Sequence, residues 1–292
     1  MDARRLRYFL AIHDNASISR AAANLGIAQP ALSQQLALLE RDLGARLFDR
    51  TPTGVQATPA AERLYPHARA LLTDLDQLSE IVRGPARAKV RIGLMASVAF
   101  GLGVDLIEAA RRLDPPVDLQ LIEDRNDVLS AMVEQGLLDF AIVAHRNAGH
   151  CEYETLAAEP LVYACSASWS VSDQVSMREL ADAPLVLTAR PHSVRTLVDC
   201  ALDQAGVTPH VVAEVNSLGV LIQAVSSGIG ASFLHAPVLR GIAGVKVCRT
   251  EINISRTLLL CRRPTVSSAA TQRLLDETRA LVRAWADGGM DA

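Results

Sequence analysis

The chain has 292 residues, of which half are apolar and only 4% are aromatic, so its length predicts two or more domains with aliphatic cores. A net charge of −3 excludes a bulk electrostatic signal for nucleic acid, and no apolar run reaches the ~18 residues that a membrane span needs. The segment MDARRLRYFLAIHDN lacks the long apolar stretch of a signal peptide, so we expect a cytoplasmic protein with no membrane partner.

The first 47 residues predict three short helices joined by tight turns, because apolar residues recur at three- and four-residue spacing. Ser17 or Ser19 can cap the second helix, since a serine oxygen accepts a backbone N–H, and Gly26 can end it in the left-handed conformation. Proline in a first turn loses no hydrogen bond, so the third helix begins near Gln29-Pro30 and runs to Leu43-Gly44. The apolar face of this third helix carries Leu32, Leu36 and Leu39.

Residues 47–58 predict a different local structure. The segment LFDRTPTGVQAT holds two short β-like runs with Pro52 and Gly54 as turn residues between them, a pattern typical of a β-hairpin wing. Thr58 and Pro59 then favour a new helix, with threonine as the N-cap and proline in the first turn.

The helix predicted over 59–84 carries the most regular pattern in the chain. Six small or apolar residues are spaced 4, 3, 4, 3 and 4 apart and form an a/d seam of about three heptads: Leu64, Ala68, Leu71, Leu75, Leu78 and Val82. Packing of this seam onto its own domain is the alternative. The break at Gly84-Pro85 directly after the seam favours pairing with a second subunit, and hence a homodimer.

Strand-like and helix-like segments alternate after Pro85. We expect strands at 89–97, 117–123, 139–143, 161–165, 185–189, 211–215, 231–235 and 256–263. Helices are expected at 101–113, 127–137, 193–205, 218–228 and 268–286. This alternation predicts the α/β class, with a largely parallel sheet and helices on both of its faces.

The segment from Ser19 to Glu40 meets the physical requirements of a helix-turn-helix, because Ala22 is small where two helices approach and Gly26 permits the turn. The outer face of its second helix exposes amide and hydroxyl groups that can hydrogen-bond to base edges. We therefore expect DNA contacts from Gln29, Pro30, Ala31, Ser33 and Gln34. No lysine or arginine occurs from 21 to 40, so an ordinary three-helix bundle with a polar outer face is the alternative.

Several motifs in this region occur in a recognisable order. Residues 21–22 are paired alanines, 29–33 are Gln-Pro-Ala-Leu-Ser, 39–44 are Leu-Glu-Arg-Asp-Leu-Gly, and 47–50 are Leu-Phe-Asp-Arg. In this combination the first 60 residues resemble the amino-terminal domain of LysR-type transcriptional regulators. Weaker similarity continues through LLDFAIV (137–143), EPL (159–161) and AVSSGIGASFL (224–234). One departure is Ala61, where the family usually has glycine.

The resemblance implies a winged helix-turn-helix domain at 1–58, a linker helix at 59–85 that forms an antiparallel dimer, and an effector-binding domain at 86–292. The last would have the periplasmic-binding-protein-like fold, with lobe I at about 88–160 and 264–292 and lobe II at about 161–263. The resemblance also implies double-stranded DNA as a partner, a homotetramer built as a dimer of dimers, and RNA polymerase as a further candidate partner.

The wing departs from the family at its tip. In the family, the residues that match Arg50 and Thr53 lie near phosphates or the minor groove. Here Thr53 and Gly54 replace the more basic wing tip that is common in relatives, which predicts a weaker wing contact. In the second region, the sequence Pro191-x-Ser193 with Arg195 is similar to the nitrogen-assimilation-control branch of the family.

If the second region folds as two lobes, a ligand should bind between them at the carboxyl ends of the strands. A helix N-terminus favours an anion, and arginine pairs well with carboxylate or phosphate. We expect effector contacts from Ser97, Val98, Arg125, His145, Thr188, Arg190, His192, Ser193, Arg195 and Asn216. Each arginine alone is better explained as a surface residue, but together they favour a small anionic effector. A regulator that needs no effector is the alternative.

The sequence shows no catalytic constellation, so we expect neither an enzyme nor a cofactor or metal. The seven histidines lack metal-ligand spacing, and GLGVDL (101–106) lacks the third glycine of a phosphate-cradling loop. Five widely spaced cysteines predict reduced thiols: Cys151, Cys165, Cys200, Cys248 and Cys261. A redox-sensing regulator that uses Cys151 or Cys261 is one alternative function. A small-molecule-binding protein without DNA function is another.

Overall fold

A computed structural model describes residues 2–83, 88–251, 253–264 and 268–287. The chain forms two compact units, the first built on residues 1–86 and the second on most of residues 87–292. Among the described residues, no helix combines the length and the apolar character that a bilayer crossing needs.

The first unit begins with three helices, α1 (Ala3–Asn15), α2 (Ile18–Leu25) and α3 (Gln29–Leu43). Of the two predicted capping serines, Ser17 is the N-cap of α2 and accepts a hydrogen bond from the Arg20 backbone N–H. Gly26 ends α2 with a φ of 66°, a left-handed conformation that glycine adopts without strain. The predicted helix-turn-helix is therefore formed by α2 and α3.

One apolar cluster holds the three helices together. Ala21 and Ala22 of α2 are fully or almost fully buried, because a larger side chain at either position would keep α2 from α1 and α3. The cluster consists of Leu6, Phe9, Ile12, Ala21, Ala22, Leu32, Leu36, Leu39, Leu47, Phe48, Val55, Ala61, Ala68 and Leu72. Each of the three inward positions predicted for α3 is among them, so its opposite face is left for solvent.

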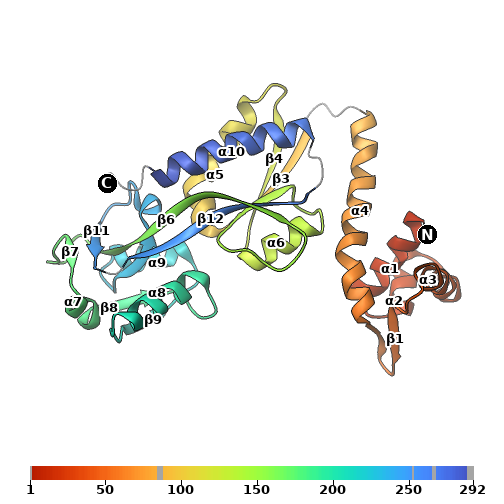
Figure 1. The fold of residues 1–292 in the computed structure, drawn as a ribbon, viewed down its shortest axis with the longest axis horizontal. Coiled ribbons are helices and arrows are strands. Elements are labelled where there is room, and N and C mark those ends of the chain that lie inside the picture. The colour runs from red at the N-terminus through yellow and green to blue at the C-terminus, as the bar shows by residue number, and fades with distance from the viewer. Residues whose placement is uncertain (1, 84–87, 252, 265–267, 288–292) are drawn as a thin grey trace. The chain divides into compact units, whose positions relative to one another are not determined.

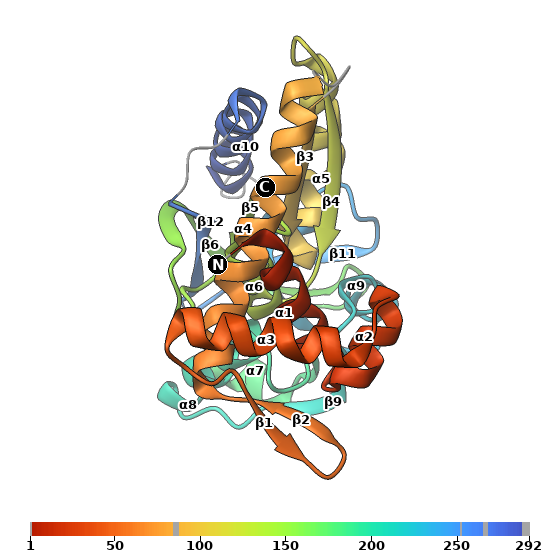
Figure 2. The same cartoon turned by 90° about the vertical axis from the view of Figure 1, so that its right-hand side faces the viewer.

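Strands β1 (Phe48–Thr51) and β2 (Gly54–Ala57) form the predicted hairpin, which projects from the helices (Figures 1 and 2). The Val55 N–H donates to the Ala16 carbonyl oxygen at 3.1 Å and fastens the hairpin to the turn between α1 and α2. Gly54 is required here, because its φ is 151° and a Cβ at this position would collide with that same carbonyl.

Helix α4 (Pro59–Arg83) begins at the predicted cap, where the Thr58 hydroxyl oxygen accepts the Ala61 N–H. The predicted seam divides into two parts. Ala68 packs into the core of the first unit, and Leu64 packs against that core. Farther along, Leu71, Leu75 and Leu78 are 47%, 38% and 54% exposed. The side chain of Val82 and the break at Gly84-Pro85 lie outside the described residues.

The second unit is built, over its described residues, on an eight-stranded mixed sheet. Seven strands follow the order β4-β3-β5-β12-β6-β11-β7, and β10 pairs with β6. Strands β3 (Ala88–Leu94), β4 (Val117–Glu123) and β5 (Phe140–Val143) are parallel to one another. The long strands β6 (Glu152–Ser166) and β12 (Ile254–Arg262) are antiparallel and run through the whole unit (Figure 1).

The remaining strands lie around the C-terminal part of β6, with which β10 and β11 pair. This part of the unit contains β7 (Gln174–Val175), β10 (Ser232–His235), β11 (Val245–Thr250), a 3-10 turn (Ala236–Leu239), and a separate parallel pair of β8 (Pro184–Leu187) and β9 (His210–Glu214). The helices of the unit are α5 (Ala96–Arg112), α6 (Asn126–Glu134), α7 (Met177–Asp182), α8 (Ser193–Gln204), α9 (Leu218–Ser226) and α10 (Ala269–Asp287).

Two predictions for this unit were wrong. The sheet is not largely parallel, because β6 pairs antiparallel with β10, β11 and β12. Residues 95–97 do not continue the first strand, since Met95 is the N-cap of α5 and the helix begins five residues before the predicted start. Polar residues in the first half of β6 concealed the true length of that strand. The short elements β7, α7 and β11 lack a clear pattern and were not predicted.

Candidate nucleic-acid interface and ligand crevice

The outer face of α3 holds the predicted base-reading residues close to the helix N-terminus. Gln29, Pro30, Ala31 and Gln34 are exposed and Ser33 is half-buried. The Gln29 side-chain amide donates to the Ser33 hydroxyl oxygen at 3.0 Å, so one hydrogen-bonding position of each side chain is occupied within the helix. The five residues carry no charged side chain, and the face offers hydrogen-bonding groups instead of charge.

The predicted wing residues are also exposed. Arg50 lies on β1 opposite Val55, and its guanidinium makes no ion pair or hydrogen bond with any described residue. Thr53 lies at the exposed tip of the hairpin. The hairpin therefore presents an uncommitted cation and a hydroxyl to a polyanion.

A polar and aromatic cluster, which the sequence did not reveal, ties α1 to α4. The imidazole of His13 stacks on the Tyr65 ring with 4.1 Å between centroids. The Tyr65 hydroxyl donates to the Asp14 carboxylate at 2.7 Å, and Arg69 donates to the same carboxylate at 3.1 Å. This cluster fixes the direction in which α4 leaves the three helices.

In the second unit, the carboxyl ends of β3, β4 and β5 carry the first group of predicted effector residues. Ser97 is 7% exposed and Val98 is fully buried in the first turn of α5, and the Val98 N–H donates to the Met95 carbonyl. Arg125 is exposed and donates to the Asp127 carboxylate at 2.8 Å. His145 is exposed, and the backbone of its loop is held by the buried Asn126 side chain.

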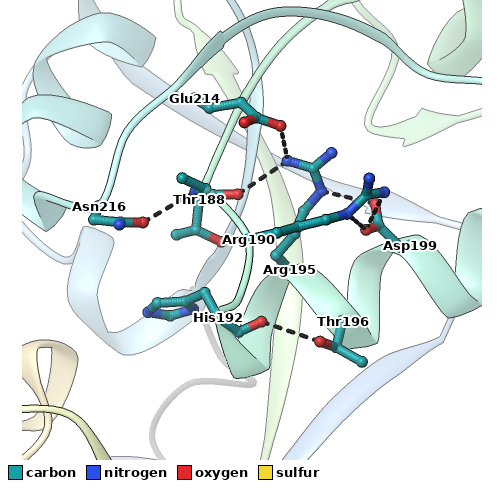
Figure 3. Close-up of polar contacts among 9 residues, drawn as sticks. Thr188, Arg190, His192, Arg195, Thr196, Asp199, Glu214 and Asn216 are labelled. Carbon is teal, nitrogen blue, oxygen red and sulfur yellow. Dashed lines mark hydrogen bonds and ion pairs between the residues drawn. The ribbon is translucent and has the colours of Figure 1, made fainter.

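The second group surrounds the N-terminus of α8 (Figure 3). Arg195 is almost completely buried and donates to Asp199 at 2.8 Å, to Glu214 at 2.6 Å and to the Thr188 carbonyl at 3.0 Å. Arg190 is exposed and donates to the same Asp199 carboxylate at 2.6 Å. Burial alone would raise the pKa of Asp199, but the hydrogen bonds from the two arginines lower it below its ordinary value.

His192 and Asn216 complete this group. His192 is the N-cap of α8, where its Nδ1 accepts the Val194 N–H at 3.2 Å. Burial lowers the pKa of His192, and the nearby Arg256 guanidinium lowers it further. Asn216 accepts the Ala189 N–H at 3.0 Å, and Ser193 is the first residue of the helix. The loop from Thr188 to Ser193 is therefore held by contacts within the chain.

Two buried charged residues that sequence reasoning missed lie where the two groups approach each other. Arg256 of β12 donates to Glu159 of β6 at 2.6 Å and to the Ser97 hydroxyl at 2.7 Å. An arginine in the apolar run RTLLLCRR was the signal in the sequence, but it gave no sign of a partner 97 positions away. Arg256 connects a predicted residue on α5 with the surroundings of His192.

The two cysteines considered for a redox function, Cys151 and Cys261, differ in burial, and a further cysteine, Cys165, is also buried. Cys261 is fully buried in β12, and Cys151 is partly buried with its thiol 3.9 Å from the Ser130 carbonyl. Burial, with a smaller contribution from the adjacent Cys248, raises the pKa of Cys165 to about 12. Since the thiolate is the reactive form, burial makes Cys165 a poor nucleophile.

Comparison with known protein families matches one family to each of the two units. Residues 3–62 match the family described as "Bacterial regulatory helix-turn-helix protein, lysR family". Residues 83–283 match the family described as "LysR substrate binding domain".

The chain is similar over most of its length to individual members of this family. It is 31% identical to the nitrogen assimilation regulatory protein nac of Escherichia coli over 281 residues, which cover 92% of each chain. It has a TM-score of 0.67 and 23% identity to full-length OxyR C199D from Pseudomonas aeruginosa, covering 97% of this chain and 98% of the other. It has a TM-score of 0.56 and 20% identity to CbnR solved with its target DNA, covering 96% of this chain and 99% of the other.

Proposed function

The chain belongs to the LysR family of bacterial transcription regulators, and we propose on this basis that it binds DNA through α3 and the β1–β2 wing. We propose a DNA-binding domain at 1–58, a dimerising linker at 59–85 and an effector-binding domain at 86–292. Lobe I would take about 88–160 and 264–292, and lobe II about 161–263. A regulator of this kind acts in the cytoplasm and catalyses no reaction.

The exposed, hydrogen-bonding face of α3 carries this proposal. Gln34 and Gln29 have the amide geometry that pairs bidentately with adenine, and Ser33 accepts from or donates to several bases. Pro30 and Ala31 leave room for a close approach to base edges and methyl groups. The wing residues Arg50 and Thr53 contact the sugar–phosphate backbone of the DNA. Such contacts position the recognition helix but carry no sequence information.

Dimerisation through α4 is the second part of the proposal. Leu71, Leu75 and Leu78 leave an exposed apolar seam on a helix whose first half is held against its own domain. Burying such a seam against a second copy removes it from water and spaces two recognition helices for two half-sites. We further propose a homotetramer, since several weakly charged reading heads gain affinity by binding together. RNA polymerase is a further candidate partner.

The second unit is proposed to bind a small anionic effector between its lobes. The support is the position of Ser97 at the N-terminus of α5 and the presence of Arg256 beside it. The contacts proposed from the sequence at Val98, Arg125, His145, Thr188, Arg190, His192, Ser193, Arg195 and Asn216 stay part of this proposal. Of these, Arg125, Arg190 and Arg195 already bind carboxylates of the chain, so an effector would have to exchange with them.

Fluorescence anisotropy with labelled DNA from upstream of the protein's own gene tests the DNA-binding part. We expect tighter binding to this duplex than to a scrambled one at a fixed salt concentration. Phosphate contacts depend on salt and contribute equally to both duplexes, so any difference in affinity comes from contacts to the bases. The scrambled duplex is the control, since it measures nonspecific binding directly. No binding to either duplex would favour a small-molecule-binding protein without DNA function, and equal affinity for both would contradict sequence reading by α3.

A further inference from the structure

Glu159 and Arg256 face each other across the two strands that run through the whole second unit. The antiparallel register of β6 and β12 places them directly opposite each other. Glu159 is 0% exposed and Arg256 is 7% exposed, and two Arg256 nitrogens lie 2.6 Å from the same carboxylate oxygen. A charge pair at this depth is a costly arrangement unless its remaining hydrogen bonds are also satisfied.

The hydrogen bonds of this pair are only partly satisfied. Arg256 also donates to the Ser97 hydroxyl in the first turn of α5. The second carboxylate oxygen of Glu159 is buried without a hydrogen-bond partner among the described residues. His235 is 4% exposed, and both of its ring nitrogens lack a described partner with hydrogen-bond geometry, although Nδ1 lies 3.1 Å from Glu159.

Unpaired polar atoms at this depth are rare in stable folds and call for a reason. A guanidinium, a serine hydroxyl and a helix N-terminus together form a strong position for an anion. In this structure the guanidinium of this group already binds an anion, the Glu159 side chain of the chain itself. The Arg256–Ser97 group therefore resembles a binding site whose cation holds a covalently built-in ligand.

We propose that Glu159 is an internal ligand of the Arg256–Ser97 site, and that a carboxylate effector acts by displacing it. This inference rests on the effector site proposed above. The displaced carboxylate has a second partner within reach, because His235 Nδ1 can donate to it in one tautomer. Since Ser97 belongs to α5 in the proposed lobe I, whereas His235 belongs to β10 in the proposed lobe II, the exchange changes the contacts between the two lobes.

This arrangement also sets which ligands can act. A neutral ligand cannot replace a carboxylate at Arg256 without leaving the buried guanidinium unpaired. A weakly binding anion cannot displace Glu159, which is held at high effective concentration by the fold. Because Glu159 competes for Arg256, the apparent affinity of every carboxylate equals its intrinsic affinity multiplied by the fraction of molecules in which Arg256 is free.

Chemical rescue of the full-length protein tests the proposal, with sodium acetate as the probe and sodium chloride at equal ionic strength as the control. Glu159→Ala removes the internal carboxylate and leaves space at Arg256, so we expect acetate to raise its Tm more than chloride does. The double variant Glu159→Ala with Arg256→Met is the matched control, because it keeps the space and removes the cation. Equal acetate effects on the two variants would overturn the proposal.

A second variant covers the case in which Glu159→Ala does not fold. Glu159→Gln keeps the shape of the side chain but not its charge, so acetate should bind it at least about tenfold more tightly than the wild type. Equal or weaker acetate binding than in the wild type would also overturn the proposal. DNA binding by the wild type is measured separately, so loss of the proposed DNA function would leave the acetate result standing.

Discussion

The outer face of α3 and the predicted effector residues of the second unit use their polar side chains in opposite ways. On α3 the predicted residues are exposed, and the hydrogen bond between Gln29 and Ser33 joins two neighbours on the same helix. Among the predicted effector residues, Arg125, Arg190 and Arg195 each bind a carboxylate of the chain, and Ser97 binds Arg256.

This difference distinguishes two kinds of binding. A surface whose groups are exposed and bonded only to neighbours on the same helix can dock on a partner with little rearrangement, so mutations there should change affinity and leave stability unchanged. A site whose groups are already paired must exchange one partner for another, so binding is coupled to a change of structure. Substitutions in the two regions should therefore separate a loss of stability from a loss of affinity.

Breaking the buried pair should cost the most stability. We expect Arg256→Met to lower the free energy of unfolding by about 3–5 kcal/mol, because it leaves the Glu159 carboxylate buried without a counter-ion. Urea denaturation measures the loss. The double variant Glu159→Leu with Arg256→Met should recover much of the stability, since an apolar pair of similar volume has no charge to desolvate. A double variant less stable than the single one would contradict this account.

Shortening the exposed seam of α4 should act on assembly and not on folding. We expect Leu75→Ala with Leu78→Ala to weaken dimerisation by about 3 kcal/mol, at roughly 0.75 kcal/mol for each of the four half-exposed leucines, two in each subunit, that the dimer would bury. Analytical ultracentrifugation at several concentrations gives the dimer dissociation constant. The buried Leu72 of the same helix is the control, because Leu72→Ala should lower stability instead. Unchanged dimerisation in the first variant would place the dimer interface elsewhere.

Removing the base-reading groups of α3 should change specificity alone. Ser33→Ala with Gln34→Ala is expected to weaken operator binding by about 1–3 kcal/mol and to leave binding to scrambled DNA and the Tm unaltered. Arg50→Ala provides the contrast, since a wing contact to phosphate should weaken binding to both duplexes equally. If the α3 variant loses affinity for both duplexes to the same extent, α3 does not read the bases.

The smallest expected effect is a loss of stability in mild acid. Burial lowers the pKa of His235 well below its ordinary value, and Arg256 and His192 lower it further. A group with a lowered pKa in the folded state takes up its proton more readily in the unfolded state. The fold therefore has its full stability above pH 6.5, where His235 is neutral in both states, and loses stability as the pH falls below that value. This loss is at most about 1.4 kcal/mol per pH unit. Denaturation at pH 7.5 and 5.5 should show a smaller difference for His235→Gln than for the wild type.

Features that depend on short-range patterns could be predicted from the sequence. Helix caps, the turn glycine and the inward leucines of α3 follow from spacing and backbone preference, so Ser17, Gly26 and the limits of α2 and α3 were predictable. The hairpin and α4 were predictable for the same reason, as were β4, α8 and α10.

Which residues meet became clear from the folded chain alone. Periodicity cannot tell which part of the α4 seam packs on its own domain, nor that polar residues 152–160 extend β6 into a long antiparallel strand. The pairing of Arg195 with Glu214 depends on where α8 lies beside β9, whereas Asp199 lies one turn farther along the same helix. The contact between Glu159 and Arg256 joins residues 97 positions apart, and burial then turns an ordinary charge pair into a strong constraint. Local sequence sets the elements, whereas desolvation in the assembled fold sets the chemistry of the buried Glu159–Arg256 pair.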